Sequence, residues 1–80
     1  MKVHVKFIAS YRKLLPSDAV GNRFEVEIAP GTTVRELLSR YGVPLTDDSV
    51  ILINGLASNG LDQLLADGDQ VAAFSAMAGG

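Results

Sequence analysis

Val71-Ala72-Ala73-Phe74-Ser75-Ala76-Met77-Ala78-Gly79-Gly80 ends the chain as a strand-like run that passes into small residues and stops in two glycines. We interpret it as the last strand of the fold followed by a tail. The preceding residues are expected to fold into a compact domain that presents this tail. Glycine reaches backbone angles closed to other residues, so Gly79-Gly80 can form a thin end that carries its carboxylate into a narrow active site. The alternative is an ordinary frayed terminus, because a terminal Gly-Gly arises by chance in roughly one chain in two hundred.

Length and composition indicate one small domain. The 80 residues include no cysteine, which excludes disulfides, thiol nucleophiles and zinc-thiolate sites. The N-terminus has no apolar signal-peptide core, and no apolar run is long enough to cross a bilayer. We therefore expect a cytoplasmic protein without a membrane partner.

The net charge of −2 hides an uneven distribution. Residues 1–40 carry all seven Lys and Arg, whereas residues 41–80 carry five acids and no base. This pattern argues against nucleic-acid binding, which needs a concentrated basic face with aromatic platforms. It favours a protein partner with a basic groove around the tail, or else an ordinary solvated acidic surface.

Hydrophobic periodicity predicts the elements of the first half. Residues 2–8 and 24–28 alternate as two antiparallel strands, and residues 9–23 open with a short helical turn and form a connecting loop. Thr33 and Glu36 have the capping-box spacing, so a helix begins there and ends before Gly42. Its apolar stripe, which should lie across the sheet, consists of Val34, Leu37, Leu38 and Tyr41.

The second half is predicted to supply the remaining strands. The β-branched run at residues 50–53 is typical of a strand covered on both faces or central in the sheet. Asn54-Gly55 favours a hairpin into a short strand at residues 56–58. Residues 61–65 could form a single helical turn, Asp67-Gly68-Asp69 a tight turn, and residues 71–75 the last strand.

This order describes an α+β domain with one helix packed on a mixed sheet. If the first and last strands are adjacent in the centre, Val71 and Ala73 join the core. The outer face of the sheet would then hold His4, Lys6, Ile8, Ala72 and Phe74.

Catalytic side chains are not recognisable. His4 is the only histidine and is interpreted as structural or exposed, so no metal site is predicted. Asp67 and Asp69 are interpreted as turn formers rather than as an acid/base pair. The glycines match no nucleotide-binding motif, so no stably bound cofactor is expected.

Several stretches in order resemble the MoaD/ThiS family of sulfur carriers, most closely the small subunit of molybdopterin synthase. They are residues 7–14, residues 31–38, Ile53-Asn54-Gly55, residues 65–72 and the terminal Ala78-Gly79-Gly80. The resemblance implies a ubiquitin-like β-grasp fold, with four to five strands and one main helix, over residues 1–75. Residues 76–80 would be a flexible diglycine tail.

The resemblance also implies a chemistry for the tail formed by Met77, Ala78, Gly79 and Gly80. A separate ubiquitin-activating-type enzyme of the MoeB/ThiF kind, using ATP and Mg²⁺, would adenylate the Gly80 carboxylate. A persulfide donor would then supply sulfur to give a thiocarboxylate. The chain would be a non-catalytic carrier that delivers this sulfur inside a MoaE-like large subunit of molybdopterin synthase, in molybdenum or tungsten cofactor biosynthesis.

Two further features bear on this assignment. Ile8 and Phe74 match positions where the family docks its partners through an apolar patch. The molybdopterin-type carriers usually have two prolines before the tail, where this chain has Ser75-Ala76, so the tail loses more entropy on insertion. The alternatives are a sulfur carrier for thiamine or another thiolation pathway, a protein modifier conjugated through Gly80, and a β-grasp interaction module with an incidental tail.

Overall fold

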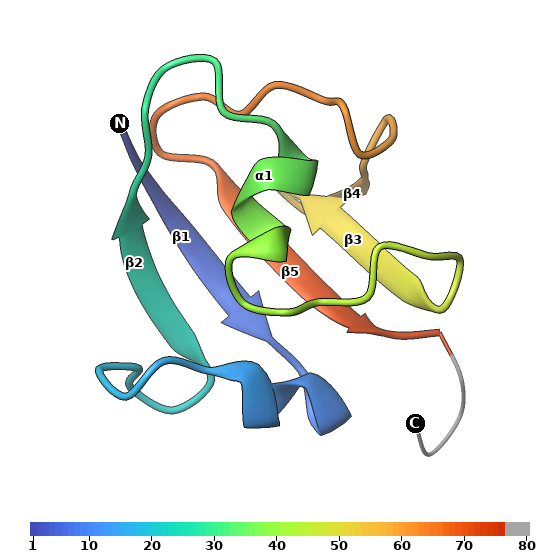
Figure 1. Ribbon diagram of the computed structural model, residues 1–80. Helices are drawn as coiled ribbons and strands as arrows, with labels where there is room; N and C mark the ends of the chain where they lie inside the picture. Colours follow the sequence, from blue (N-terminus) through green and yellow to red (C-terminus); the bar gives the residue numbers. More distant parts are fainter. Residues whose placement is uncertain (77–80) are drawn as a thin grey trace.

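Five strands form one mixed sheet in the order β2-β1-β5-β3-β4 in a computed structural model that describes residues 1–76 (Figure 1). The strands are β1 (Lys2–Phe7), β2 (Arg23–Glu27), β3 (Ser49–Ile53), β4 (Leu56–Ala57) and β5 (Gln70–Ser75). The helices are the 3₁₀ helix η1 (Ala9–Leu14) and the α-helix α1 (Val34–Ser39). The predicted α+β class, with one α-helix packed on a mixed sheet, is confirmed.

The first and last strands lie side by side in the middle of the sheet, as predicted. β1 is parallel to β5, with Val5 opposite Val71 and Phe7 opposite Ala73, and antiparallel to β2. All four of these side chains are buried. Because side chains alternate across a strand, the residues between them face the other side of the sheet.

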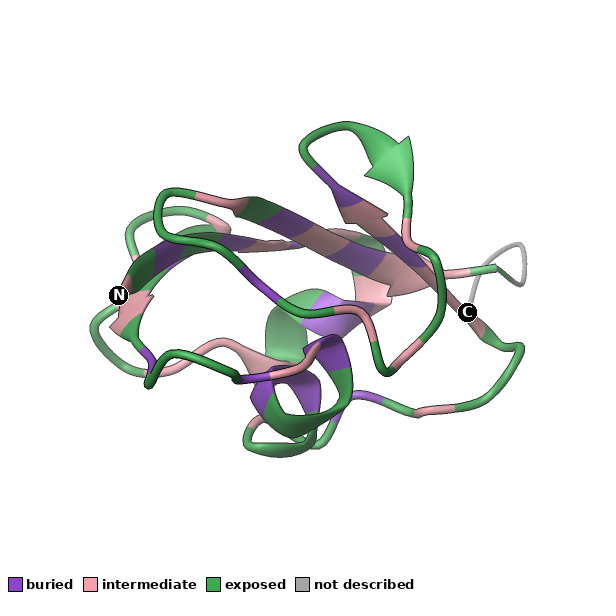
Figure 2. Cartoon of the chain, turned by 90° about the horizontal axis from the view of Figure 1, so that it is seen from above, coloured by how far each residue is buried: buried purple, intermediate pink, exposed green. Residues whose placement is uncertain are grey.

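Helix α1 packs on the inner face of the sheet and leaves the outer face uncovered (Figure 2). Its Val34, Leu37 and Leu38 are fully buried. The predicted capping box is present: the Glu36 amide donates to Thr33 Oγ1 over 3.2 Å, and the Thr33 amide donates to Glu36 Oε1 over 3.1 Å. The sequence therefore fixes where the helix begins.

The prediction of a single helical turn at residues 61–65 holds only in part: Leu61 and Asp62 form a turn in which the Gln63 amide donates to the Gly60 carbonyl over 3.2 Å, and residues 63–65 are not helical. The carbonyls of Gln63 and Leu61 accept the first amides of α1, those of Val34 over 3.0 Å and Arg35 over 2.8 Å. The first amides of a helix have no hydrogen-bond partner within the helix. Residues 61–65 supply these partners because their backbone passes beside the start of α1. Tertiary capping of α1 thus overrides the local helical pattern.

Two other segments differ in part from expectation. The connection after β1 opens with the six-residue 3₁₀ helix η1, where a short helical turn was expected. β3 is not covered on both faces: Ile51 and Ile53 are buried on the helix side, whereas Val50 and Leu52 are only half-buried on the outer side. β3 lies beside the central strand β5, which explains its apolar character.

Candidate functional site

The candidate site is the point where the chain leaves the central strand β5. Gly80 and the other predicted tail residues, Met77, Ala78 and Gly79, lie outside the described residues. The last described residue is Ala76, whose amide donates to the Asp48 carbonyl over 2.7 Å. The backbone of Ala76 is thus held against the loop that precedes β3.

A hydroxyl network fixes the neighbouring strand end. Ser49, the first residue of β3, pairs with Ser75 of β5. Ser49 Oγ donates to the Pro44 carbonyl over 2.6 Å and lies 2.6 Å from the hydroxyl of Tyr11. Because Ser49 has one hydroxyl proton, Tyr11 is the donor in that second contact.

We call Tyr11, Pro44, Asp48, Ser49 and Ala76 the tail anchor. Tyr11 belongs to η1 and is buried, so the anchor joins η1 to the β3–β5 ladder. Both elements reach this end of the sheet (Figure 1). Sequence reasoning missed the anchor, because no local pattern links Tyr11 to a serine 38 residues away.

The two predicted docking residues lie on the outer face near this end. Phe74 follows the buried Ala73 and is opposite Val50, and Ile8 follows the buried Phe7. The Ile8 amide donates to the Ala73 carbonyl over 3.1 Å, so Ile8 remains beside β5 beyond the end of β1. Both side chains are half-buried, and their role in partner binding stays a prediction.

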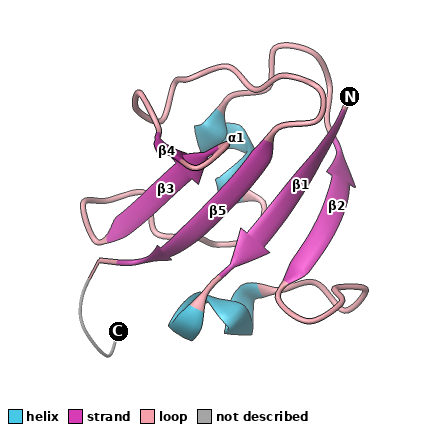
Figure 3. Cartoon of the chain, turned by 180° about the vertical axis from the view of Figure 1, so that it is seen from behind, coloured by secondary structure: helices cyan, strands magenta, loops and turns pink. Residues whose placement is uncertain are grey.

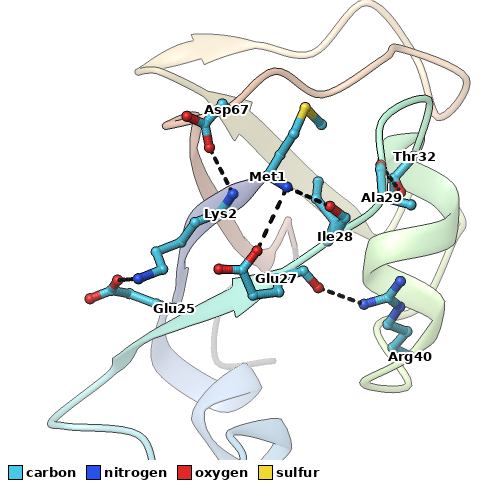
Figure 4. Close-up of polar contacts among 9 residues, drawn as sticks. All are labelled: Met1, Lys2, Glu25, Glu27, Ile28, Ala29, Thr32, Arg40 and Asp67. Carbon is cyan, nitrogen blue, oxygen red and sulfur yellow. Dashed lines mark hydrogen bonds and ion pairs between the residues drawn. The ribbon is translucent and has the colours of Figure 1, made fainter.

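Asp67 and Asp69 serve the turn before β5, as interpreted. Asp67 Oδ1 accepts the Lys2 amide over 2.8 Å (Figure 4). Asp69 accepts the Ala66 amide over 2.8 Å and the side-chain amide of Asn54 over 3.0 Å. These contacts tie the turn to β1 and to the β3–β4 hairpin, which accounts for both carboxylates without acid/base chemistry.

Side chains that could bind a metal ion do not cluster in the part of the chain that the structure describes. It holds no cluster of three or more His, Asp or Glu that could bind a metal ion, and His4 is exposed on β1. Burial raises the pKa of Tyr41, opposed by Arg40 and reinforced by Asp18. Tyr41 is partly buried and packs against the core residues Phe7 and Phe24.

A groove crosses the outer face of the sheet, which faces the viewer in Figure 3. Its lining includes Lys6, Arg23, Leu52 and Ala72. Lys6 and Ala72 were placed on this face from the sequence. Arg23 and Leu52 were not, because their position beside Lys6 and Ala72 depends on the strand register.

Three comparisons relate the chain to known proteins. A family model described as Mut7-C ubiquitin matches residues 1–78. A search of curated protein sequences finds no significant match. Among solved structures, SAMP1 from Haloferax volcanii has a TM-score of 0.76 at 23% identity, with 100% of both chains covered.

Two further structures bear the name of molybdopterin converting factor. A putative subunit 1 from Pyrococcus furiosus has a TM-score of 0.73 at 28% identity and covers 95% of this chain and 98% of its own. The complex of subunits 1 and 2 from Helicobacter pylori has a TM-score of 0.64 at 19% identity, with 100% of both chains covered. The predicted ubiquitin-like β-grasp fold and the resemblance to MoaD-like proteins are confirmed.

Within the described residues, none of the helices is long and apolar enough to span a membrane.

Proposed function

This chain belongs to the Mut7-C ubiquitin family, and from this premise we propose that it is a sulfur carrier that acts through the carboxylate of Gly80. The family and the structural neighbours support a sulfur-carrier or ubiquitin-like role in general. The thiocarboxylate and its pathway are our proposal.

The observation that carries the proposal is where the anchored strand ends. β5 is the central strand, and its ladder with β3 continues to the Ala76–Asp48 hydrogen bond. Four residues follow Ala76, ending in Gly79-Gly80. A segment of four residues spans at most about 14 Å, so the rigid domain must dock close to the active site that receives Gly80.

The tail anchor also restricts the two positions where related carriers usually have prolines. Ser75 and Ala76 occupy the positions where related carriers usually have two prolines, and both belong to the β3–β5 ladder or its continuation. Backbone hydrogen bonding restricts these residues without the ring constraint of proline. Ser75 and Ala76 therefore lose little conformational entropy when the tail is inserted into a partner.

The chemistry needs an activating partner. The Gly80 carboxylate would attack the α-phosphate of ATP and release pyrophosphate, giving an acyl adenylate. Sulfide attack would expel AMP and leave a thiocarboxylate, with no change in oxidation state. A persulfide donor would give an acyl disulfide, which a thiol reduces to the same product. ATP and Mg²⁺ belong to the activating enzyme, and the carrier supplies only the reactive end.

We place the sulfur in molybdopterin synthesis, with a MoaE-like large subunit as acceptor. The named subunit 1 from Pyrococcus furiosus supports this pathway, and the two-subunit complex from Helicobacter pylori supports such a partner. A second candidate is a protein modifier joined to lysines through Gly80. It is favoured by the likeness to a structure named small archaeal modifier protein 1, at 23% identity and a TM-score of 0.72.

Intact mass spectrometry tests the proposal. The chain is incubated with its activating enzyme, ATP, Mg²⁺ and sulfide, and the expected product has one oxygen replaced by sulfur at Gly80. A variant lacking Gly79 and Gly80 is the control and should gain no mass. An unchanged wild-type mass, with an enzyme shown to be active on another carrier, would refute the carrier role.

A second measurement separates the two candidates. Peptide mapping of cell lysates should find a free thiocarboxylate at Gly80 and no Gly80 attached to lysine side chains. Lysine conjugates without a thiocarboxylate pool would instead establish the modifier.

A further inference from the structure

The outer face of β1 and β2 carries charges in two different arrangements. Towards the start of β1, opposite charges meet: Lys2 Nζ lies 3.4 Å from Glu25, and the N-terminal amino group lies 3.6 Å from Glu27 (Figure 4). Such pairs are the expected pattern for neighbouring strands. This part of the ladder is electrostatically balanced.

The far end of the same ladder is not balanced. Lys6 lies directly opposite Arg23, and neither forms an ion pair with any residue between positions 1 and 76. Like charges directly opposite each other destabilise a sheet. Sequences break such local rules mainly at functional sites.

The backbone holds this cation pair in place. The Val20 amide donates to the Arg23 carbonyl over 2.9 Å, and the Arg23 amide donates back to the Val20 carbonyl over 3.2 Å. Lys6 is half-buried within a paired strand. Both backbones are therefore fixed, and only the side chains have to reach a ligand.

The floor of the groove beside the pair is apolar. Leu52 and Ala72 are paired across β3 and β5 and are half-buried, and Val20 is 83% exposed at the edge. Two carboxylates also line the groove, those of Asp18 and Glu25, and Glu25 is engaged by Lys2. The groove thus has a cationic end at Lys6 and Arg23 next to an apolar floor.

We propose that this groove binds an acidic, apolar segment of a protein partner. A carboxylate of the partner lies between the Lys6 ammonium and the Arg23 guanidinium, and a neighbouring aliphatic or aromatic side chain packs on Leu52 and Ala72. Charge complementarity and the apolar floor favour this occupant. The half-buried floor of Leu52 and Ala72 favours a peptide over a polyphosphate, which has no apolar side chain to pack on it. The site does not depend on the chemistry proposed for Gly80.

Peptide selection tests the proposal. A random library of 12-residue displayed peptides is selected against the full chain, and the enriched sequences are expected to place Asp or Glu next to Leu, Ile or Phe. Binding of the enriched peptides should weaken by about 1.5- to 5-fold for each of Lys6→Gln and Arg23→Gln. It should also weaken as salt is raised. Lys13→Gln is the matched control, because Lys13 is an exposed cation on η1 outside the groove.

Two further measurements make the result decisive. Backbone NMR signals of Lys6, Arg23, Leu52 and Ala72 should shift on adding an enriched peptide, and the glutamine variants should unfold no more easily than the wild type. Selection of peptides without acidic enrichment, or equal binding to the Lys6→Gln, Arg23→Gln double variant, would overturn the proposal. Both variants leave Gly80 intact. The mass-spectrometric test for a thiocarboxylate at Gly80 therefore stays independent of the peptide-binding test.

Discussion

At the scale of single residues, Asn54 shows how one side chain joins three parts of the fold. It begins the Asn54-Gly55 turn of the β3–β4 hairpin with a φ of 55°, and Gly55 follows with a φ of 85°. Asparagine and glycine tolerate this left-handed region better than other residues. The Asn54 side chain also donates to Asp69 and accepts the Gln70 amide over 2.9 Å.

We predict that Asn54→Ala lowers the free energy of unfolding by about 2–4 kcal/mol. The change removes two hydrogen bonds of roughly 0.5–1.5 kcal/mol each and forces alanine into a left-handed conformation that costs about 1 kcal/mol. Urea unfolding followed by circular dichroism measures it. Asn59→Ala is the control, expected within about 0.5 kcal/mol, because Asn59 is exposed and contributes only its backbone amide to a hydrogen bond with Gln63. Equal effects of the two substitutions would contradict the assigned role.

At the scale of elements, the tail anchor joins η1 and the start of β3 to the end of β5. The Tyr11 hydroxyl of η1 holds Ser49, and Ser49 begins the strand that pairs with Ser75. The 3₁₀ helix η1 therefore does more than connect β1 to β2. It stabilises the ladder from which the tail departs.

We predict that Tyr11→Phe and Ser49→Ala each lower the free energy of unfolding by about 1 kcal/mol. The double variant should lose less than the sum, because the two side chains share one hydrogen bond. In both single variants the Ala76 amide should exchange its hydrogen faster, since local opening of the ladder exposes it.

Urea unfolding and NMR hydrogen exchange measure the two effects. The control is Ser17→Ala, in an exposed loop. Unchanged exchange at Ala76 would show that the network stabilises the core without controlling the strand end.

At the scale of the whole molecule, the two faces of the sheet have separate tasks. The inner face is covered by α1 and holds the core, and the outer face is left uncovered (Figures 2 and 3). The outer face has an apolar region with Ile8 and Phe74 near the tail and a cation pair on β1 and β2.

We predict that Phe74→Ser weakens binding to the activating enzyme by about tenfold, the size of a typical interface hot spot. Calorimetry or the concentration dependence of adenylation measures it. Leu64→Ser is the matched control and should change little, because Leu64 is 64% exposed but lies beside Thr33 at the start of α1. An unfolding curve for each variant excludes loss of folded protein. Equal weakening by both substitutions would argue against a docking patch at Phe74.

The sequence by itself determined the local elements of this protein. Alternation predicted β1 and β2, the Thr33–Glu36 spacing predicted the start of the helix, and Asn54-Gly55 predicted the hairpin turn. These features depend on residues within one strand, one helical turn or one tight turn, where side-chain period and backbone preference are decisive.

Tertiary structure alone decided the contacts between distant segments. A period of two does not set which residues of neighbouring strands face each other, so only the register placed Lys6 opposite Arg23. Tyr11 meets Ser49 because η1 packs against β5, the partner strand of β3. Residues 61–65 form no helix because the carbonyls of Leu61 and Gln63 accept the first amides of α1. In each case a distant group, absent from the local pattern, satisfies the hydrogen bond or supplies the charge.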